Sequence, residues 1–406
     1  MNKKKIFNDP VYGFVNIPYD LVFDLIEHPY FQRLRRIQQL GLTHLVYPGA
    51  MHSRFHHAIG AMHLMGMAVD VLRSKGHEIT HEEAEAVTIA ILLHDIGHGP
   101  YSHVLEHSLV SGVSHEDLSI ILMNRLNQEF SGRLTMAIQI FCNDYAKKFL
   151  HQLVSSQLDM DRLDYLSRDS FYTGVSEGVV STDRIIKMLE IYDNRLAIES
   201  KGIYSIEKFI IARRLMYWQV YLHKTVISAE QLLIKILNRA KELVNAGEEI
   251  YATPALRIFL EGRIVAQDFD QDERVLAAYA ELDDFDIFAS LKIWKYHRDP
   301  VLSLLSSHLI ERKLYKIRLE DKPFHESEVE AHLENIKKKH GFTQQDAAYF
   351  VFTGIIENNA YNSQIDKINI LYRDGSVRDI AEASDQLNIS VLSTPVRKHF
   401  LCFMAN

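Results

Sequence analysis

The sequence predicts a mainly α-helical protein with a small C-terminal α/β appendage. Most of residues 20–310 carries apolar residues at helical spacing, whereas alternating apolar and polar residues appear after about residue 312. The chain has 406 residues, of which 47% are hydrophobic and 24% charged, a balance typical of globular proteins. We therefore expect a helical body over residues 1–320 and an appendage over residues 321–406.

The helical body shows its periodicity most clearly in four segments. We expect helices at residues 55–72, 82–96, 150–168 and 206–244. The second of these runs into Gly97 and Pro100, two residues that end helices. Residues 196–205 alternate around Lys201 and Gly202, which predicts a small hairpin between the two longer helices.

The appendage shows a different pattern. We expect a helix at residues 327–339 and strands at residues 314–319, 349–355 and 368–372. The last strand ends at residues 373–376 (RDGS), a turn signal. This mixture indicates a small α/β unit packed on the helical body.

Composition and charge exclude several classes of protein. The longest apolar run is far shorter than the roughly 20 residues that cross a bilayer, and no apolar segment follows the basic N-terminus. The two cysteines, Cys142 and Cys402, form no disulfide framework, which is typical of a reducing compartment. The net charge of −8 does not indicate a basic surface for a nucleic-acid partner, although a local basic pocket stays open. These observations predict a cytoplasmic protein without a membrane partner.

Histidine is the unusual residue of this chain. There are 21 histidines, and twelve of them lie between His44 and His115. Histidine is the commonest metal ligand and carries protons near neutral pH, so this clustering predicts a functional site. We expect about half of the gathered histidines, including His77 and His81, to have no role in it.

Two imidazoles and two carboxylates form a candidate metal site. His94 lies on the apolar face of its helix, and Asp95 follows it at the helix end. His57 lies on a helix face with small neighbours, and Asp161 lies on an inward helix face. This donor set suits a six-coordinate first-row metal with open positions for water and substrate. The alternative for His94 and Asp95 is a structural hydrogen bond at a helix terminus.

Two further groups of residues are predicted from their spacing in the sequence. His98, His103 and His115 exceed what one metal needs, so they suit phosphate binding and proton transfer to a leaving group. The alternative is a Gly-Pro turn with incidental histidines. Asp164 and Arg168 lie four residues apart, which predicts an ordinary intrahelical ion pair.

Together these motifs resemble the HD-domain metal-dependent phosphohydrolases. The similarity is greatest to the branch with the vertebrate SAM-and-HD-domain deoxynucleoside triphosphate (dNTP) triphosphohydrolase and its bacterial relatives, over about residues 5–320. We expect no SAM domain and an HD core at about residues 50–170. The principal motifs are residues 54–57 (RFHH), 94–103 (HDIGHGPYSH), 115–116 (HE) and 159–165 (DMDRLDY). Further similarity lies at residues 8–13 (NDPVYG), 31–41 (FQRLRRIQQLG), 47–50 (YPGA) and 221–224 (YLHK).

The resemblance implies hydrolysis of a dNTP to a deoxynucleoside and tripolyphosphate with one divalent metal (Mn, Fe, Mg, Co, Ni or Zn). The implied metal ligands are His57, His94, Asp95 and Asp161. The implied catalytic residues are His98, Glu106 and His115, with Glu106 in place of the vertebrate Asp. The implied phosphate contacts are Arg54, His103, Arg162 (in place of Lys), Tyr165 and Arg213. The implied sugar-pocket residues are Gln39, Leu40, Asp169 and Tyr221.

The resemblance also implies a regulatory nucleotide site between subunits of a homo-oligomer, a dimer or tetramer. The matching residues are Lys5, Asn8, Gln32, Arg35, Arg184, Lys224, Arg312 and Lys316. The alternative is that they are solvated surface residues.

Two other functions stay open on the sequence. The protein could be a different HD phosphohydrolase, acting on nucleoside monophosphates, guanosine tetraphosphate or cyclic dinucleotides. It could also be a nucleotide sensor without turnover.

Overall fold

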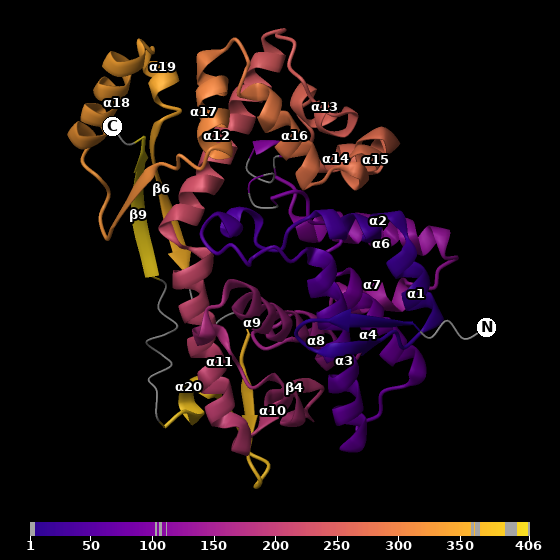
Figure 1. The fold of residues 1–406 in the computed structure, drawn as a ribbon. Coiled ribbons are helices and arrows are strands. Elements are labelled where there is room, and N and C mark those ends of the chain that lie inside the picture. The colour runs from indigo at the N-terminus through magenta and orange to yellow at the C-terminus, as the bar shows by residue number, and fades with distance from the viewer. Residues whose placement is uncertain are drawn as a thin grey trace.

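The structure, a computed structural model, describes residues 5–101, 104, 108–110, 112–358, 361, 366–385 and 396–404. Helices dominate it, and a few small sheets lie at its edges (Figure 1). The predicted fold class, a mainly helical body with small β elements near the C-terminus, is confirmed. None of the described helices is long and apolar enough to cross a membrane.

The N-terminal segment forms a hairpin and four short helical turns. Strands β1 (Ile6–Asp9) and β2 (Gly13–Asn16) pair antiparallel, and the Asp9 carboxylate accepts the backbone N–H groups of Val11 and Tyr12. The turn closes through Gly13, whose φ of 77° lies in the left-handed region. The helical turns are α1 (Asp20–Glu27), α2 (Pro29–Gln32), η1 (Arg33–Arg36) and η2 (Gly41–Leu45).

The centre of the body consists of helices α3 (Arg54–Ser74), α4 (His81–Leu93) and α9 (Met160–Thr173). Helix α3 packs against both others. Thr80 and Glu83 form a capping box that begins α4, whose last turns are buried. The predicted helices at 55–72 and 82–96 are therefore found, the second ending earlier. The flanking helices are α6 (His115–Glu129), α7 (Thr135–Phe141) and α8 (Lys148–Val154).

The remaining helices surround this centre. Figure 1 shows α13, α14, α15, α16 and α17 gathered at one end of the molecule. Those at that end are α13 (Pro254–Glu261), α14 (Ala266–Gln271), α15 (Glu273–Glu281), α16 (Asp284–Trp294) and α17 (Pro300–Ile310). The others are η3 (Ser176–Gly178), α10 (Thr182–Lys187), η4 (Ser200–Gly202), α11 (Ile203–Met216), the π-helical turn η5 (Tyr217–Tyr221) and α12 (Lys224–Asn245).

Two of the predicted helices are each interrupted. Residues 150–168 are not one helix, because the chain leaves α8 and Asp159 caps α9, accepting the backbone N–H groups of Ser156 and Arg162 at 2.7 Å each. Residues 206–244 divide into α11, η5 and α12, and the His223 ring accepts the N–H of Thr225 to begin α12. An apolar stripe can resume in phase after such a break, so periodicity did not reveal it.

The hairpin predicted around Lys201 and Gly202 is wrong. The actual hairpin lies earlier, between β3 (Leu189–Tyr192) and β4 (Arg195–Glu199). Its turn residues Asp193 and Asn194 have φ values of 47° and 59°. Asp and Asn tolerate this left-handed conformation better than other non-glycine residues, which makes them the true turn signal.

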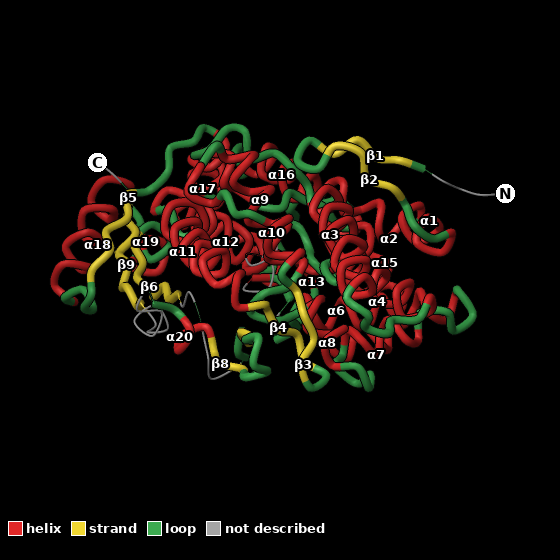
Figure 2. The backbone as a smooth tube through the Cα atoms, turned by 90° about the horizontal axis from the view of Figure 1, so that it is seen from below, coloured by secondary structure: helices red, strands yellow, loops and turns green. Residues whose placement is uncertain are grey.

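The C-terminal elements form two sheets. Strands β5 (Lys316–Glu320), β9 (Val396–Phe403) and β6 (Val351–Asn358) make an antiparallel sheet in that order, beside α18 (Glu326–His340) and α19 (Gln344–Ala347) (Figure 2). Strands β7 (Asn369–Leu371) and β8 (Val377–Asp379), followed by α20 (Ile380–Ala383), extend the sheet of β3 and β4. The appendage thus shares sheets with the preceding chain, and a boundary at residue 320 stays a prediction.

Candidate active site

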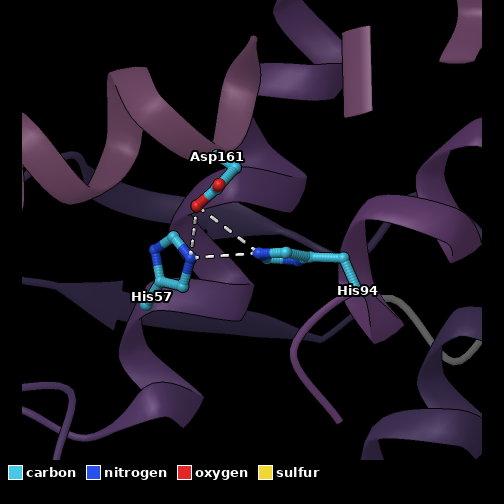
Figure 3. Close-up of side chains that lie close together, drawn as sticks. All are labelled: His57, His94 and Asp161. Carbon is cyan, nitrogen blue, oxygen red and sulfur yellow. Dashed lines mark hydrogen bonds and ion pairs between the residues drawn. The ribbon is translucent and has the colours of Figure 1, made fainter. Parts of the chain in front are cut away.

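Three side chains from different parts of the chain converge on one point. His57 comes from α3, His94 directly follows α4, and Asp161 comes from α9 (Figure 3). The Nε2 atom of His57 lies 3.3 Å from His94 Nε2 and 3.1 Å from Asp161 Oδ1. The His94 Nε2 to Asp161 Oδ1 distance is 3.5 Å. These three residues could hold a divalent metal, because their nitrogen and oxygen atoms face one another at the spacing of a shared ligand shell.

Asp95 lies beside the two imidazoles and joins them to Arg54. Its Oδ1 lies 3.3 Å from His94 Nε2, and its Oδ2 lies 3.7 Å from His57 Nε2. Arg54 Nη1 donates a hydrogen bond of 2.6 Å to Oδ2. Burial opposes ionisation of Asp95, but electrostatic interactions with His94, His98 and Arg54, together with the contact to the His98 ring, outweigh it and hold the Asp95 pKa well below the usual value.

The outer nitrogens of both imidazoles have acceptors. His57 Nδ1 lies 2.7 Å from Asp164 Oδ2, and His94 Nδ1 lies 2.6 Å from the Ile91 carbonyl oxygen. A proton on each Nδ1 satisfies these contacts and leaves the Nε2 lone pair directed at the shared point. Both rings are therefore oriented so that their Nε2 atoms could bind a metal.

Asp164 and Arg168 form the predicted ion pair, but it is not an ordinary surface pair. Both side chains are fully buried, and Arg168 holds Asp164 through Nε and Nη2 at 2.9 Å each. Arg168 Nη1 also donates to Asp9 Oδ2 at 2.8 Å, which ties the N-terminal hairpin to the His57 support. A Cβ atom on Gly60 would lie 2.0 Å from both Arg168 Nη2 and Asp164 Oδ1, so this position requires glycine.

Asp9 and Asp164 were not predicted as supports of the site. The signal that could have found them is Gly60, a small residue in the helix of His57 that permits close approach. An i, i+4 spacing alone does not distinguish a buried pair from an exposed one.

A second pair of histidines lies beside the carboxylate of Asp95. His98 Nε2 is 3.2 Å from Asp95 Oδ1. The His98 and His115 rings stack with centroids 3.8 Å apart and planes 16° apart. Burial and the charge of Arg54 hold the pKa of His98 well below its usual value, which keeps its ring neutral. His103 and Glu106, the other two expected members, lie outside the described residues.

The cationic residues expected at phosphate groups lie around this cluster. Arg162 follows Asp161 on α9, where its Nε donates to the Ser156 carbonyl at 2.6 Å. Arg213 Nη1 donates to Gln157 Oε1 at 3.2 Å, in the same loop before α9. The Tyr165 and Tyr221 rings meet edge to face at 6.2 Å. The structure thus gathers most of the expected phosphate contacts near one end of α9.

A cavity of about 380 Å³ adjoins the cluster through Arg54. Its lining includes Gln39, Leu40 and Tyr221, three of the four expected sugar-pocket residues. Asp169 lies behind this wall, where it accepts the Tyr221 hydroxyl at 2.7 Å and contacts His52 Nε2 at 2.8 Å. Direct contact between Asp169 and a sugar stays a prediction.

The expected regulatory residues are exposed, except for the half-buried Gln32. Arg35 Nε donates to Gln32 Oε1 at 2.9 Å, and its guanidinium lies 3.5 Å from the centre of the Phe55 ring. Lys5 lies over the Phe23 ring. The exposed residues are Lys5, Asn8, Arg35, Arg184, Lys224, Arg312 and Lys316. Among these, Arg184 lines a separate groove of about 960 Å³.

Comparison with known proteins supplies the family. The HD domain matches residues 54–169, and the HD associated region matches residues 180–258. A solved phosphohydrolase of Bacteroides thetaiotaomicron is 54% identical, with a TM-score of 0.96 over 99% of this chain and 100% of that one. This chain belongs to the HD-domain phosphohydrolases. The predicted resemblance is confirmed, and membership supports hydrolase activity.

Three further proteins show lower identity to this chain than that structure does. The uncharacterized protein YwfO of Bacillus subtilis is 33% identical over 95% of this chain and 88% of its own length. A deoxynucleoside triphosphate triphosphohydrolase SAMHD1 homolog of Dictyostelium discoideum is 33% identical over 61% of this chain and 51% of its own length. A hypothetical protein of Aquifex aeolicus has a TM-score of 0.70 at 26% identity, over 99% of this chain and 96% of that one.

Proposed function

We propose that this HD phosphohydrolase is a metal-dependent dNTP triphosphohydrolase that releases a deoxynucleoside and tripolyphosphate. The observation that carries the proposal is the position of Arg54. Its guanidinium contacts Asp95 in the ligand cluster, and the same side chain lines the cavity with Gln39, Leu40 and Tyr221. A dNTP with its sugar in the cavity would therefore place its α-phosphate near the cluster. The similarity to the Dictyostelium triphosphohydrolase supports this substrate class.

The donor set fits one divalent metal, which we assign to His57, His94, Asp95 and Asp161. Two carboxylates and two imidazoles oriented through Nε2 leave open positions for water and a phosphate oxygen. A metal bound there supplies Lewis-acid polarisation of the phosphate and a water of lowered pKa. Mn, Fe, Mg, Co, Ni and Zn are the candidate ions.

The residues around the ligand cluster are assigned to phosphate binding and to proton transfer. Arg54, Arg162, Arg213, Tyr165 and His103 are assigned to the phosphates, because cationic and hydroxyl donors stabilise the charge that develops in the transition state. We assign proton transfer to the leaving oxygen to His98, with Glu106 and His115 as its partners. The neutral, stacked His98 ring can accept a proton and pass it on.

The cavity wall supports selection of the sugar. Leu40 would crowd a 2′-hydroxyl, and Gln39, Tyr221 and Asp169 would hold the 3′-hydroxyl directly or through the Tyr221 contact. A lost hydrogen bond or a clash of this kind is worth roughly 1–3 kcal/mol, so we expect dNTPs to react about 5- to 150-fold faster than NTPs. Equal rates on GTP and dGTP would contradict this assignment.

We further propose a cytoplasmic homo-oligomer, a dimer or tetramer, that nucleotides activate. The free thiols of Cys142 and Cys402 are consistent with a reducing compartment. Lys5, Asn8, Gln32 and Arg35 would form one part of the regulatory site. The other part would comprise Arg184, Lys224, Arg312 and Lys316. Exposed cationic groups of two subunits repel each other, and a shared triphosphate neutralises them.

The experiment that tests this proposal is a nucleotide panel with Mg, Mn, Fe and Co, in which every product is identified. The panel includes dNTPs, NTPs, nucleoside monophosphates, guanosine tetraphosphate and cyclic dinucleotides. Tripolyphosphate as the first inorganic product supports the proposal, whereas orthophosphate or pyrophosphate contradicts it.

A double variant tests the metal assignment. Replacing His94 and Asp95 by Ala should abolish both hydrolysis and metal content, because it removes half of the donor set. His81→Ala is the matched control, since His81 is exposed at the other end of α4. Full activity in the double variant would overturn the assignment.

A further inference from the structure

A segment outside both matched family regions reaches the loop that carries His98. This segment, residues 279–284, runs from the last turn of α15 to the first residue of α16, whereas the HD domain and the HD associated region end at residues 169 and 258. The loop begins after His94 and runs through His98 to Tyr101. Contacts to its backbone come from Tyr279, Leu282 and Asp284, either directly or through Arg33.

The first contacts hold the carbonyl groups between Asp95 and His98. The Tyr279 hydroxyl donates to the Gly97 carbonyl at 2.7 Å, and Tyr279 is only 2% exposed. The fully buried Arg33 donates to the Ile96 carbonyl at 2.8 Å and to the Leu282 carbonyl at 3.3 Å. Because buried carbonyls need partners, these bonds fix the path of the backbone into His98.

Asp284 joins the far end of the loop to the substrate cavity. Its Oδ1 accepts the backbone N–H of Tyr101 at 3.2 Å, and its Oδ2 accepts the N–H of Gln38 at 2.8 Å. Gln38 and Tyr101 both line the cavity that also contains Gln39. Tyr101 has a φ of 48°, a conformation that a non-glycine residue keeps only when its surroundings enforce it.

The ionised Asp284 carboxylate destabilises the folded protein, because it is buried. Burial raises its pKa to about 7, and the neighbouring Asp283 adds to the increase, while the bonds from Gln38 and Tyr101 and the charge of Arg54 oppose it. Arg36 pairs with Asp283. A buried ionisable group that lowers the stability of the fold is typical of a functional site.

We propose that Tyr279 and Asp284 are positioning residues of the active site. They act through the backbone of the loop, Tyr279 on the approach to His98 and Asp284 on the cavity wall formed by Gln38 and Tyr101. The inference rests on the hydrolase activity that we propose for this site, but not on which nucleotide is the substrate.

Two variants separate the two contacts. Tyr279→Phe keeps the ring and removes one hydrogen bond, so kcat should fall by about 2- to 12-fold while KM stays constant. Asp284→Asn sets an amide NH₂ against a backbone N–H, so it should lower kcat by about tenfold and also raise KM, because Gln38 moves. Both variants should retain the metal content of the parent. Glu281→Gln, an exposed change in the same segment, is the matched control.

The pH profile and amide exchange complete the test. Displacement of His98 should shift the pH profile of kcat, which a loss of stability alone would not do. Hydrogen–deuterium exchange should accelerate at residues 96–101 in both variants and at residue 38 in Asp284→Asn. Unchanged exchange in these peptides, or unchanged kinetics in an active background, would overturn the inference. A parent that hydrolyses another nucleotide contradicts only the dNTP proposal, and the exchange measurement needs no activity.

Discussion

Because Asp164 holds the Nδ1 atom of His57, we expect that replacing Asp164 weakens the binding of a metal at His57. Asp164 is fully buried and accepts three hydrogen bonds, one from His57 Nδ1 and two from Arg168, at 2.7 to 2.9 Å. Asp164→Asn keeps the shape of the side chain, removes its charge and replaces one acceptor oxygen by a donor. The His57 ring then loses its charged partner.

The expected magnitude follows from these contacts. Loss of the partner of a metal-binding histidine typically weakens metal affinity 10- to 100-fold, or by about 1.4–2.7 kcal/mol. Breaking a buried ion pair costs about 3–5 kcal/mol of stability. Arg168 stays paired with the Asp9 carboxylate at 2.8 Å in this variant. We therefore expect the loss of stability to be at the lower end of that range, about 3 kcal/mol.

The assay is calorimetric titration of the metal-free protein with Mn²⁺ or Co²⁺, together with urea unfolding without metal. Asp183→Asn, which removes an exposed carboxylate on α10, is the control and should change neither quantity. If Asp164→Asn binds metal as tightly as the parent while folded, the histidine is not oriented by this contact and the reasoning fails.

Three further predictions concern stability and assembly. Gly60→Ala should destabilise the protein by about 3 kcal/mol or more in urea unfolding, because the new methyl group meets the Arg168 guanidinium at 2.0 Å. Gly66→Ala, in the same helix with open space around it, should be neutral or stabilising. The pKa of Asp284 rises from 3.8 unfolded to about 7 folded, so stability should fall as pH rises through this window. Asp284→Asn should flatten that slope in thermal unfolding between pH 4 and 8. Added dGTP or GTP should raise both the mass in light scattering and the rate on a second dNTP, and Arg35→Ala should uncouple the two; indifference of both to nucleotide would mean a constitutive enzyme.

Much of the fold and the centre of the site could be predicted from local patterns. The helices of His57 and His94 follow from apolar periodicity, and the His94–Asp95 pair was placed correctly at a helix end. His57, His94 and Asp161 do converge. The interruptions near residues 155–159 and 222–223 were missed, because a cap is one polar residue within an otherwise continuous apolar stripe.

Burial and long-range partners could not be predicted in this way. The spacing of Asp164 and Arg168 is the same in an exposed pair, yet packing against Gly60 and Asp9 buries it beneath His57. Asp284 follows Gln38 by more than two hundred residues and still accepts its N–H.

The amino-acid order therefore sufficed for the main helices and for the motifs that carry the family resemblance, since each depends on residues close together in the chain. Tertiary packing settled which carboxylate contacts which histidine and which distant segment contacts the loop that carries His98. The physical reason is that desolvation and hydrogen bonding act between neighbours in space, and a linear pattern specifies neighbours only within an element.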